Sequence, residues 1–164
     1  MKDQKDHPDD SSTFSQIFIQ IVFAVKGRQS LIDPSWEERL YSYTTQIIQN
    51  KGQKVFAIGD IQDHIHIFVG MKPSCRLPDL VREIKKSTNI FVNRNNFTHH
   101  KFSWQSGYGA FSYSYSQMDH VVKYVMNQKE HHKATSFRNE YIAFLDKFEI
   151  EYDEKYLFDW IQEE

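Results

Sequence analysis

The sequence lacks several features that are typical of particular classes of protein. Cys75 is the only cysteine among 164 residues, which excludes a disulfide framework and a cysteine-rich zinc site. No apolar run approaches the ~18 residues of a membrane-spanning helix, and the N-terminus lacks a signal-peptide core. We therefore expect a cytoplasmic protein. The formal net charge of −2 argues against a uniformly basic surface, so any contact with nucleic acid must come from local patches.

Aromatic residues, by contrast, are abundant, with 13 Phe, 9 Tyr and 3 Trp. A core built from rings is the simplest explanation, although rings also suit stacking on unpaired bases. The length favours one domain. We expect a disordered lead-in at 1–13, a single domain at 14–148 and an acidic aromatic tail at 149–164, docked by its rings.

Hydrophobic periodicity and capping residues predict the secondary structure. Residues 14–25 are apolar on nearly both faces of a strand, which is typical of a central strand. Asp33 and Pro34 are a good N-cap and first residue for a helix, and Ser116 with Asp119 resembles a capping box. The expected elements are a strand at 14–25, a helix at 34–50, strands at 53–60 and 63–70, a helix at 77–93, strand structure within 102–115, and helices at 117–132 and 136–148.

This order of elements predicts the fold class. Strand, helix, strand, strand, helix, strand is the split βαβ arrangement, an α+β, ferredoxin-like and RRM-like fold. We expect an antiparallel sheet with both of these helices on one face and the other face open. The helix at 117–132 and a further helix then follow this unit.

The segment 63–70 carries the first candidate site. Strand side chains alternate between faces, so His64 and His66 share one face while Ile65 and Ile67 share the other. Two imidazoles at this spacing can bind one metal ion. Asp63 could orient one of them, although its strand parity directs it to the opposite face. The alternative is a pair of exposed strand histidines without a ligand.

The second candidate site lies on the helix predicted at 117–132. Residues four apart share a helix face, so His120, Tyr124, Gln128 and His132 form one polar stripe. A tyrosine that packs in the core and extends its hydroxyl to solvent is the alternative interpretation of this stripe.

Taken in order, these motifs resemble a known family. The histidine–hydrophobe–histidine strand at 63–66, followed by a helix with Tyr124 and Gln128, resembles the HUH single-tyrosine transposases of small bacterial insertion sequences. The chain is also similar to their REP-associated relatives. The resemblance includes the first-strand text at 21–26 and the Trp-Gln-Ser-Gly-Tyr segment at 104–108, and it covers roughly 18–132.

The resemblance implies specific roles and partners. His64, His66 and Gln128 would bind a divalent metal, Mg²⁺ or Mn²⁺, and Tyr124 would be the nucleophile. The family's proteins are dimers in which the tyrosine helix can dock on the partner's histidine pair, which implies a homodimer with composite active sites. The expected substrate is single-stranded DNA from hairpin-flanked element ends.

The chemistry explains why these residue types are needed. A free phenol has a pKa near 10, so Tyr124 needs help to attack phosphorus, and a bound ion can polarise the phosphate. The product would be a 5′-phosphotyrosine and a free 3′-hydroxyl. His120 and His132 could transfer the proton. The candidate contacts to the DNA backbone are Lys26, Arg28, Arg82, Lys85, Lys86 and Arg94.

Two other functions fit part of the sequence. An RRM-like module that binds nucleic acid without cleaving it would use the same sheet. A metal-dependent hydrolase that uses water would use the histidines and keep Tyr124 as a hydrogen-bond donor.

Overall fold

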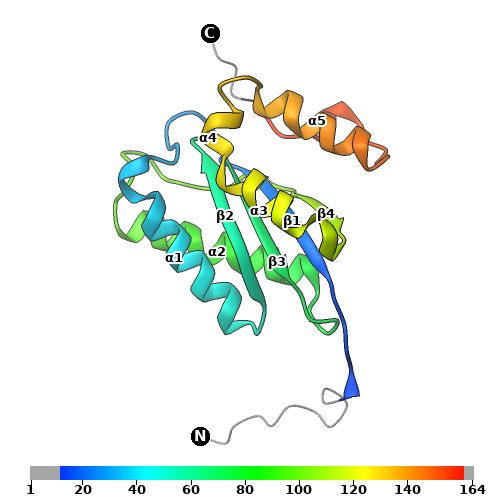
Figure 1. Cartoon of the computed structure of the whole chain (residues 1–164). Helices are drawn as coiled ribbons and strands as arrows, with labels where there is room; N and C mark the ends of the chain where they lie inside the picture. Colours follow the sequence, from blue (N-terminus) through cyan, green and yellow to red (C-terminus); the bar gives the residue numbers. More distant parts are fainter. Residues whose placement is uncertain (1–11, 161–164) are drawn as a thin grey trace, which may run out of the picture.

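A computed structural model describes residues 12–160 and contains one four-stranded antiparallel sheet (Figure 1). The strands are β1 (Phe18–Ala24), β2 (Lys54–Ile61), β3 (His64–Gly70) and β4 (Gly109–Tyr113), in the order β2-β3-β1-β4. The α+β, ferredoxin-like prediction is confirmed. So is the central position of β1, which pairs with β3 on one side and β4 on the other.

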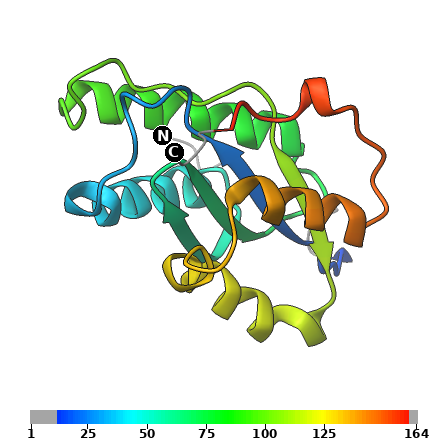
Figure 2. The same ribbon diagram turned by 90° about the horizontal axis from the view of Figure 1, so that it is seen from above.

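Two long helices cover one face of this sheet, α1 (Pro34–Asn50) and α2 (Leu77–Arg94) (Figure 2). The Asp33 side chain accepts the Ser35 N–H at 2.9 Å and begins α1 as predicted. Ile65 and Ile67 lie in the main core with buried residues of both helices. The alternation along β3 therefore directs the isoleucines towards α1 and α2 and the two histidines to the opposite face.

The opposite face is not open, which corrects the sequence prediction. It is covered in part by α3 (Met118–Met126), α4 (Gln128–His131) and α5 (Phe137–Lys147) (Figure 2). A second, smaller core forms there from Ala57, Phe68, Val121 and Val125. Phe68 shares the histidine face of β3, so α3 buries apolar surface that an open sheet would leave in water.

The predicted helix at 117–132 is also divided. A single turn of 3₁₀ helix, η2 (Tyr115–Gln117), comes first, and Ser114 and Gln117 form its capping box in place of Ser116 and Asp119. Asn127 then separates α3 from α4. The helix thus bends just before Gln128.

The C-terminal segment packs on α5. Phe158 is buried against Phe137 and Tyr141, and Trp160 also contacts both rings. Tyr152 and Tyr156 stay exposed, so two of the four tail rings dock as expected. The 3₁₀ turn η3 (Glu154–Tyr156) lies in this tail.

Parts of the predicted organisation lie beyond the described chain. The lead-in predicted at 1–13 falls outside the described residues except for its last two, and so do residues 161–164 of the tail. Within 12–160, none of the helices combines the length and the apolar character needed to cross a bilayer.

Candidate active site and metal centre

Strand β3 places His64 and His66 side by side on the covered face of the sheet. Both side chains are fully buried, and their ring centroids are 5.1 Å apart. Gly59 pairs with His66 across β2 and β3. A Cβ at Gly59 would lie 1.8 Å from the carbonyl oxygen of Val125, so glycine allows the end of α3 to approach the sheet beside the histidines.

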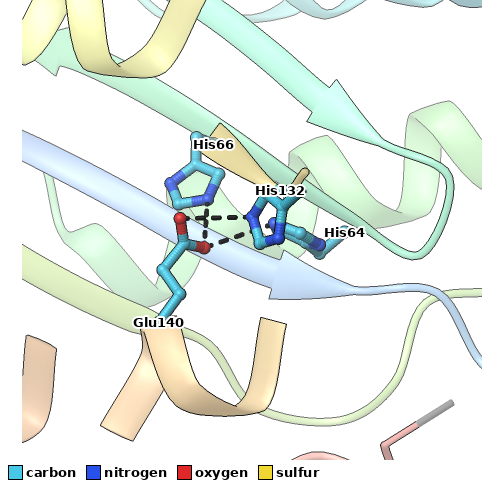
Figure 3. A group of neighbouring side chains, drawn as sticks. All are labelled: His64, His66, His132 and Glu140. Carbon is cyan, nitrogen blue, oxygen red and sulfur yellow. Dashed lines mark hydrogen bonds and ion pairs between the residues drawn. The ribbon is translucent and has the colours of Figure 1, made fainter. Parts of the chain in front are cut away.

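A carboxylate from α5 points directly at these imidazoles (Figure 3). Glu140 Oε1 lies 3.1 Å from His66 Nε2 and 3.4 Å from His64 Nε2, and Oε2 lies 3.2 Å from His132 Nε2. One ligand atom from each of the four residues falls within 4.8 Å of all the others. His131 Nε2 adds a fourth contact, 3.3 Å from Oε2. Three histidines and one glutamate therefore form a candidate metal centre.

The outer ring nitrogens fix which tautomers two of the histidines adopt. His64 Nδ1–H donates to Asp63 Oδ1 at 2.7 Å, and His132 Nδ1–H donates to the carbonyl oxygen of Thr135 at 2.9 Å. In the neutral rings, both Nε2 lone pairs then face Glu140, and neither Nε2 has a hydrogen-bond partner among the described residues. Lone pairs directed at a carboxylate repel it unless a proton or a cation lies between them. The donor set and its orientation therefore fit a divalent ion.

His66 is oriented by a different pair of residues. Gln20 Nε2 donates to His66 Nδ1 at 2.8 Å, and the Tyr113 hydroxyl donates to Gln20 Oε1 at 2.8 Å. With Nδ1 accepting, the neutral ring carries its proton on Nε2 and donates it to Glu140 Oε1. Rotation of the Gln20 amide by 180° would let it accept from Nδ1–H and would free Nε2 for a metal.

The charges of the cluster follow from this geometry. Burial by itself would raise the pKa of Glu140, but the imidazoles of His132, His64 and His66 that face the carboxylate outweigh burial and hold that pKa well below its usual range. Burial lowers the pKa of His66 to about 4. Burial also acts to lower the pKa of His64, yet the hydrogen bond to Asp63 and the neighbouring carboxylate of Glu140 outweigh burial and raise that pKa. The centre therefore combines an ionised carboxylate with a neutral His66.

Tyr124 reaches the same carboxylate from α3. Its hydroxyl donates a hydrogen bond to Glu140 Oε2, and its ring lies 5.9 Å from that of His66. Burial, followed by the charge of Glu140, raises the pKa of Tyr124. The structure thus brings the predicted tyrosine and histidine pair together within one chain, with a buried anion between them.

Gln128 lies at the start of α4 but outside the four-residue group. Its Nε2 donates to the Tyr124 carbonyl oxygen at 3.0 Å, and the residue is 1% exposed. Its Oε1 is buried and has no hydrogen-bond partner among the described residues. An amide oxygen in this condition is suited to a cation, so the predicted role of Gln128 as a metal ligand stays a proposal.

The residues predicted to bind DNA are divided between two places. Lys26 and Arg28 follow β1 at the end of the sheet near His64, because Ala24 pairs with His64. The others are on α2, which covers the face opposite the histidines, and these are Arg82, Lys85, Lys86 and Arg94.

Two residues of this predicted α2 set have protein partners. Lys85 Nζ donates to the carbonyl oxygens of Gln105 and Gly107 at 2.8 and 2.6 Å, and burial lowers its pKa to about 8. Arg82 pairs with Asp79 at 3.1 Å. Their contacts with DNA stay predictions.

The sequence analysis missed Glu140 as a site residue, although a signal was present. Phe137, Tyr141 and Phe144 repeat with helical spacing, and Glu140 lies three residues after Phe137 on that packed side. An acidic residue among inward-facing rings indicates a buried charge that needs partners. Asp63 fits its predicted role as an orienting group, because it bonds His64 from the turn before β3, where strand parity does not apply.

An antiparallel sheet with paired imidazoles on one strand and a phenol on the neighbouring helix is the arrangement expected of the transposases that the sequence resembles, a class of DNA-processing enzymes. The chain belongs to the IS200-like transposase family, because the family model described as "Transposase IS200 like" matches residues 13–128. His131, His132 and Glu140 all lie beyond the matched region. Among curated proteins, none matches the chain significantly.

Two solved structures share the fold. One is a transposase candidate from Deinococcus radiodurans R1, with 18% identity and a TM-score of 0.56, covering 71% of this chain and 94% of its own. The other is a REP-associated tyrosine transposase bound to a REP hairpin, with 13% identity and a TM-score of 0.56, covering 80% of this chain and 74% of its own.

Proposed function

We propose that this transposase cuts and rejoins single-stranded DNA through Tyr124, with a divalent ion bound at His64 and His66. One observation carries the proposal: the Tyr124 hydroxyl and both imidazoles converge on the two oxygens of a single carboxylate, Glu140. A scissile phosphate needs the same surroundings, with a nucleophile beside its phosphorus and cation ligands beside one of its oxygens.

The reaction is a transesterification at phosphorus. The Tyr124 oxygen forms a bond to phosphorus, and the bond from phosphorus to the 3′ oxygen of the preceding nucleotide breaks and leaves its electron pair on that oxygen. The phenol loses one proton and the departing 3′ oxygen gains one, so no net proton or redox partner is needed. Attack by a 3′-hydroxyl on the 5′-phosphotyrosine reverses these steps and rejoins the strand.

His64 and His66 would hold the ion, which supplies Lewis-acid polarisation of a phosphate oxygen. Gln128 is the third ligand that the family resemblance implies, and its unpartnered Oε1 supports this role. His132 and Glu140 are further donors that the fold brings within reach. Mg²⁺ prefers oxygen ligands, whereas Mn²⁺ accepts imidazole more readily, so both ions are candidates.

The proposed substrate is the single-stranded end of a hairpin-flanked element, supported by a structural neighbour that is bound to a REP hairpin. His120 and His132 remain candidates for proton transfer; His132 Nε2 lies 3.2 Å from Glu140, and His120 lines the same cavity as Tyr124. Homodimerisation also stays a prediction. Tyr124 meets the histidine pair of its own chain, so a composite site is not needed to bring them together.

The test is a covalent-adduct assay. Labelled single strands from the ends of the chain's own genomic locus are incubated with Mn²⁺ and separated on a denaturing gel. We expect a protein–DNA adduct with the wild type and none with Tyr124→Phe. Cleavage without an adduct would favour the metal-dependent hydrolase, and metal-independent binding without cleavage would favour the RRM-like module.

A further inference from the structure

A cavity of about 340 Å³ opens beside Tyr124, between α3 and α5. His120, Val121 and Tyr124 form its α3 wall, and Asn139 and Lys147 belong to the wall formed by α5. Its volume lies within the range of small-molecule sites in proteins. The cavity shares Tyr124 and Glu140 with the catalytic centre but extends away from His64 and His66, which do not line it.

The lining of this cavity combines aromatic faces with polar and cationic groups. Tyr113 and Phe144 contribute half-buried rings. Lys147 and His120 are exposed, so the ammonium group of Lys147 and the ring nitrogens of His120 are available at the opening. Aromatic rings stack on nucleobases, and cationic side chains contact phosphates. This composition fits a nucleotide better than it fits an apolar peptide.

Helix α5 supplies one whole wall, although it lies outside the family match at 13–128. The packing of Phe144 on Phe111, with ring centroids 4.9 Å apart, fixes α5 over β4. Tyr113 also lines the cavity, and its hydroxyl donates to Gln20 Oε1. The cavity is therefore built from both the shared fold and the additional helix of this chain.

We propose that this cavity binds the base of the nucleotide whose 5′-phosphate becomes joined to Tyr124. The inference rests on the proposed function, because a 5′-phosphotyrosine places that nucleotide, and no other, directly beside the Tyr124 oxygen. Its base then stacks against Tyr113 and Phe144, its edge faces the Asn139 amide, and its phosphate side faces His120 and Lys147. The cavity would thus determine which base is accepted after the cut.

The test uses the four deoxynucleoside 5′-monophosphates as probes, with 2-deoxyribose 5-phosphate as the probe without a base. Each is titrated calorimetrically into the full-length protein in Mg²⁺. We expect at least one nucleotide to bind tenfold or more tightly than the sugar phosphate. Equal affinity of the nucleotides and the sugar phosphate would overturn the proposal.

Ala143 offers a direct way to fill the cavity, since it lines the cavity and is exposed on α5. We expect Ala143→Phe to weaken nucleotide binding at least tenfold. The matched control is Ala134→Phe, an exposed alanine outside the lining, which should bind as the wild type does. If Ala143→Phe fails to fold in thermal unfolding, Ala143→Leu replaces it. Unchanged binding in a folded, filled variant contradicts the proposal.

The two experiments distinguish a refutation of the proposed base site from a refutation of the proposed strand-transfer function. Nucleotide binding that is abolished by filling the cavity, in a protein that forms no adduct with DNA, would show that the cavity holds a nucleotide and would reject both Tyr124 as the nucleophile and the assignment of that nucleotide to it. An adduct that forms with unchanged yield and unchanged base preference in Ala143→Phe would retain the function and reject the base site.

Discussion

The Tyr124 hydroxyl donates a hydrogen bond to Glu140 Oε2, while the other oxygen of that carboxylate lies 3.1 Å from His66 Nε2. Burial and the negative charge of Glu140 both raise the pKa of Tyr124, so this contact keeps the phenol protonated. A protonated phenol is a weak nucleophile. In this arrangement the carboxylate occupies the position between nucleophile and imidazoles that we assign to the scissile phosphate.

Replacing Glu140 and Gln128 one at a time tests which of the two side chains binds the ion. We expect Glu140→Gln to weaken Mn²⁺ binding by roughly ten- to hundredfold, because the substitution removes the only charged donor of the group and leaves imidazoles facing a neutral amide. Calorimetric titration with Mn²⁺ measures this, and thermal unfolding checks the fold.

Gln128→Ala is the matched comparison for this experiment. If Gln128 supplies the third ligand in the protein without DNA, its removal should weaken Mn²⁺ binding as much as Glu140→Gln does. If α5 supplies the ligands instead, Gln128→Ala should change the affinity by less than about threefold, a difference of under 1 kcal/mol. Equal affinity of all three proteins would show that neither side chain binds the ion.

Much of this site could be predicted from local sequence, and part of it could not. The strand period places His64 and His66 on one face, and helical spacing places Tyr124 and Gln128 on another element. The contact of Glu140 with His66 spans 74 residues, and no local pattern gives the docking of α5 across the sheet. The predicted open face was wrong for the same reason, since tertiary packing of α3 to α5 decides it.

The boundaries of the helices also include some that local sequence predicts and some that it does not. The cap at Asp33 depends on a bond between neighbours and was predicted correctly. The start of the tyrosine helix was not, because Ser114 competes with Ser116 as a cap and both have suitable residues three positions on. The bend at Asn127 has no proline or glycine to indicate it. Residue spacing alone therefore predicts one continuous helix at 117–132.

The bond from Gln20 to His66 should tune the metal site. Gln20→Leu removes the partner of His66 Nδ1 and is expected to weaken Mn²⁺ binding by about ten- to hundredfold, the usual effect of losing an orienting residue. Tyr113→Phe is the control, because it removes only the bond from the tyrosine to Gln20 and should have a smaller effect. A larger loss in Tyr113→Phe than in Gln20→Leu would reject this assignment.

Gly59 should tolerate no side chain. A Cβ there would lie 1.8 Å from the Val125 carbonyl oxygen, so α3 would have to move away from β2. We expect Gly59→Ala to lower the free energy of unfolding by about 3 kcal/mol and to reduce adduct formation through displacement of Tyr124. Urea unfolding and the adduct assay measure the two effects.

The control for this prediction is Gly52→Ala. Gly52 has a φ of +76°, and an added Cβ there would meet only Lys72 Nζ at 3.9 Å, an ordinary contact, so only the left-handed backbone is penalised, by about 1–2 kcal/mol. Its adduct yield should stay at the wild-type level. Equal loss of activity in both variants would mean that the approach of α3 to β2 does not position the nucleophile.

A buried carboxyl on the other side of the sheet gives a pH dependence of stability. Burial raises the pKa of Asp60 to about 7, although the hydrogen bond from Tyr41 opposes the shift. The folded state therefore retains a proton that the unfolded chain releases near pH 4. The contribution of this proton to the free energy of unfolding is fully present below pH 4. It falls by about 1.4 kcal/mol per pH unit until pH 7, where Asp60 also ionises in the folded state.

Asp60→Asn should remove this fall, because an amide does not ionise and its oxygen can still accept the Tyr41 hydroxyl. Urea unfolding at pH 5, 6 and 7 should show the variant gaining on the wild type by up to about 2–3 kcal/mol across this range. Asp146→Asn, at an exposed position on α5, is the control, and its free energy of unfolding should change with pH as that of the wild type does. A constant difference between Asp60→Asn and wild type at all three pH values would mean that Asp60 is already ionised in the folded protein, with Lys129 as the nearby cation that compensates its charge.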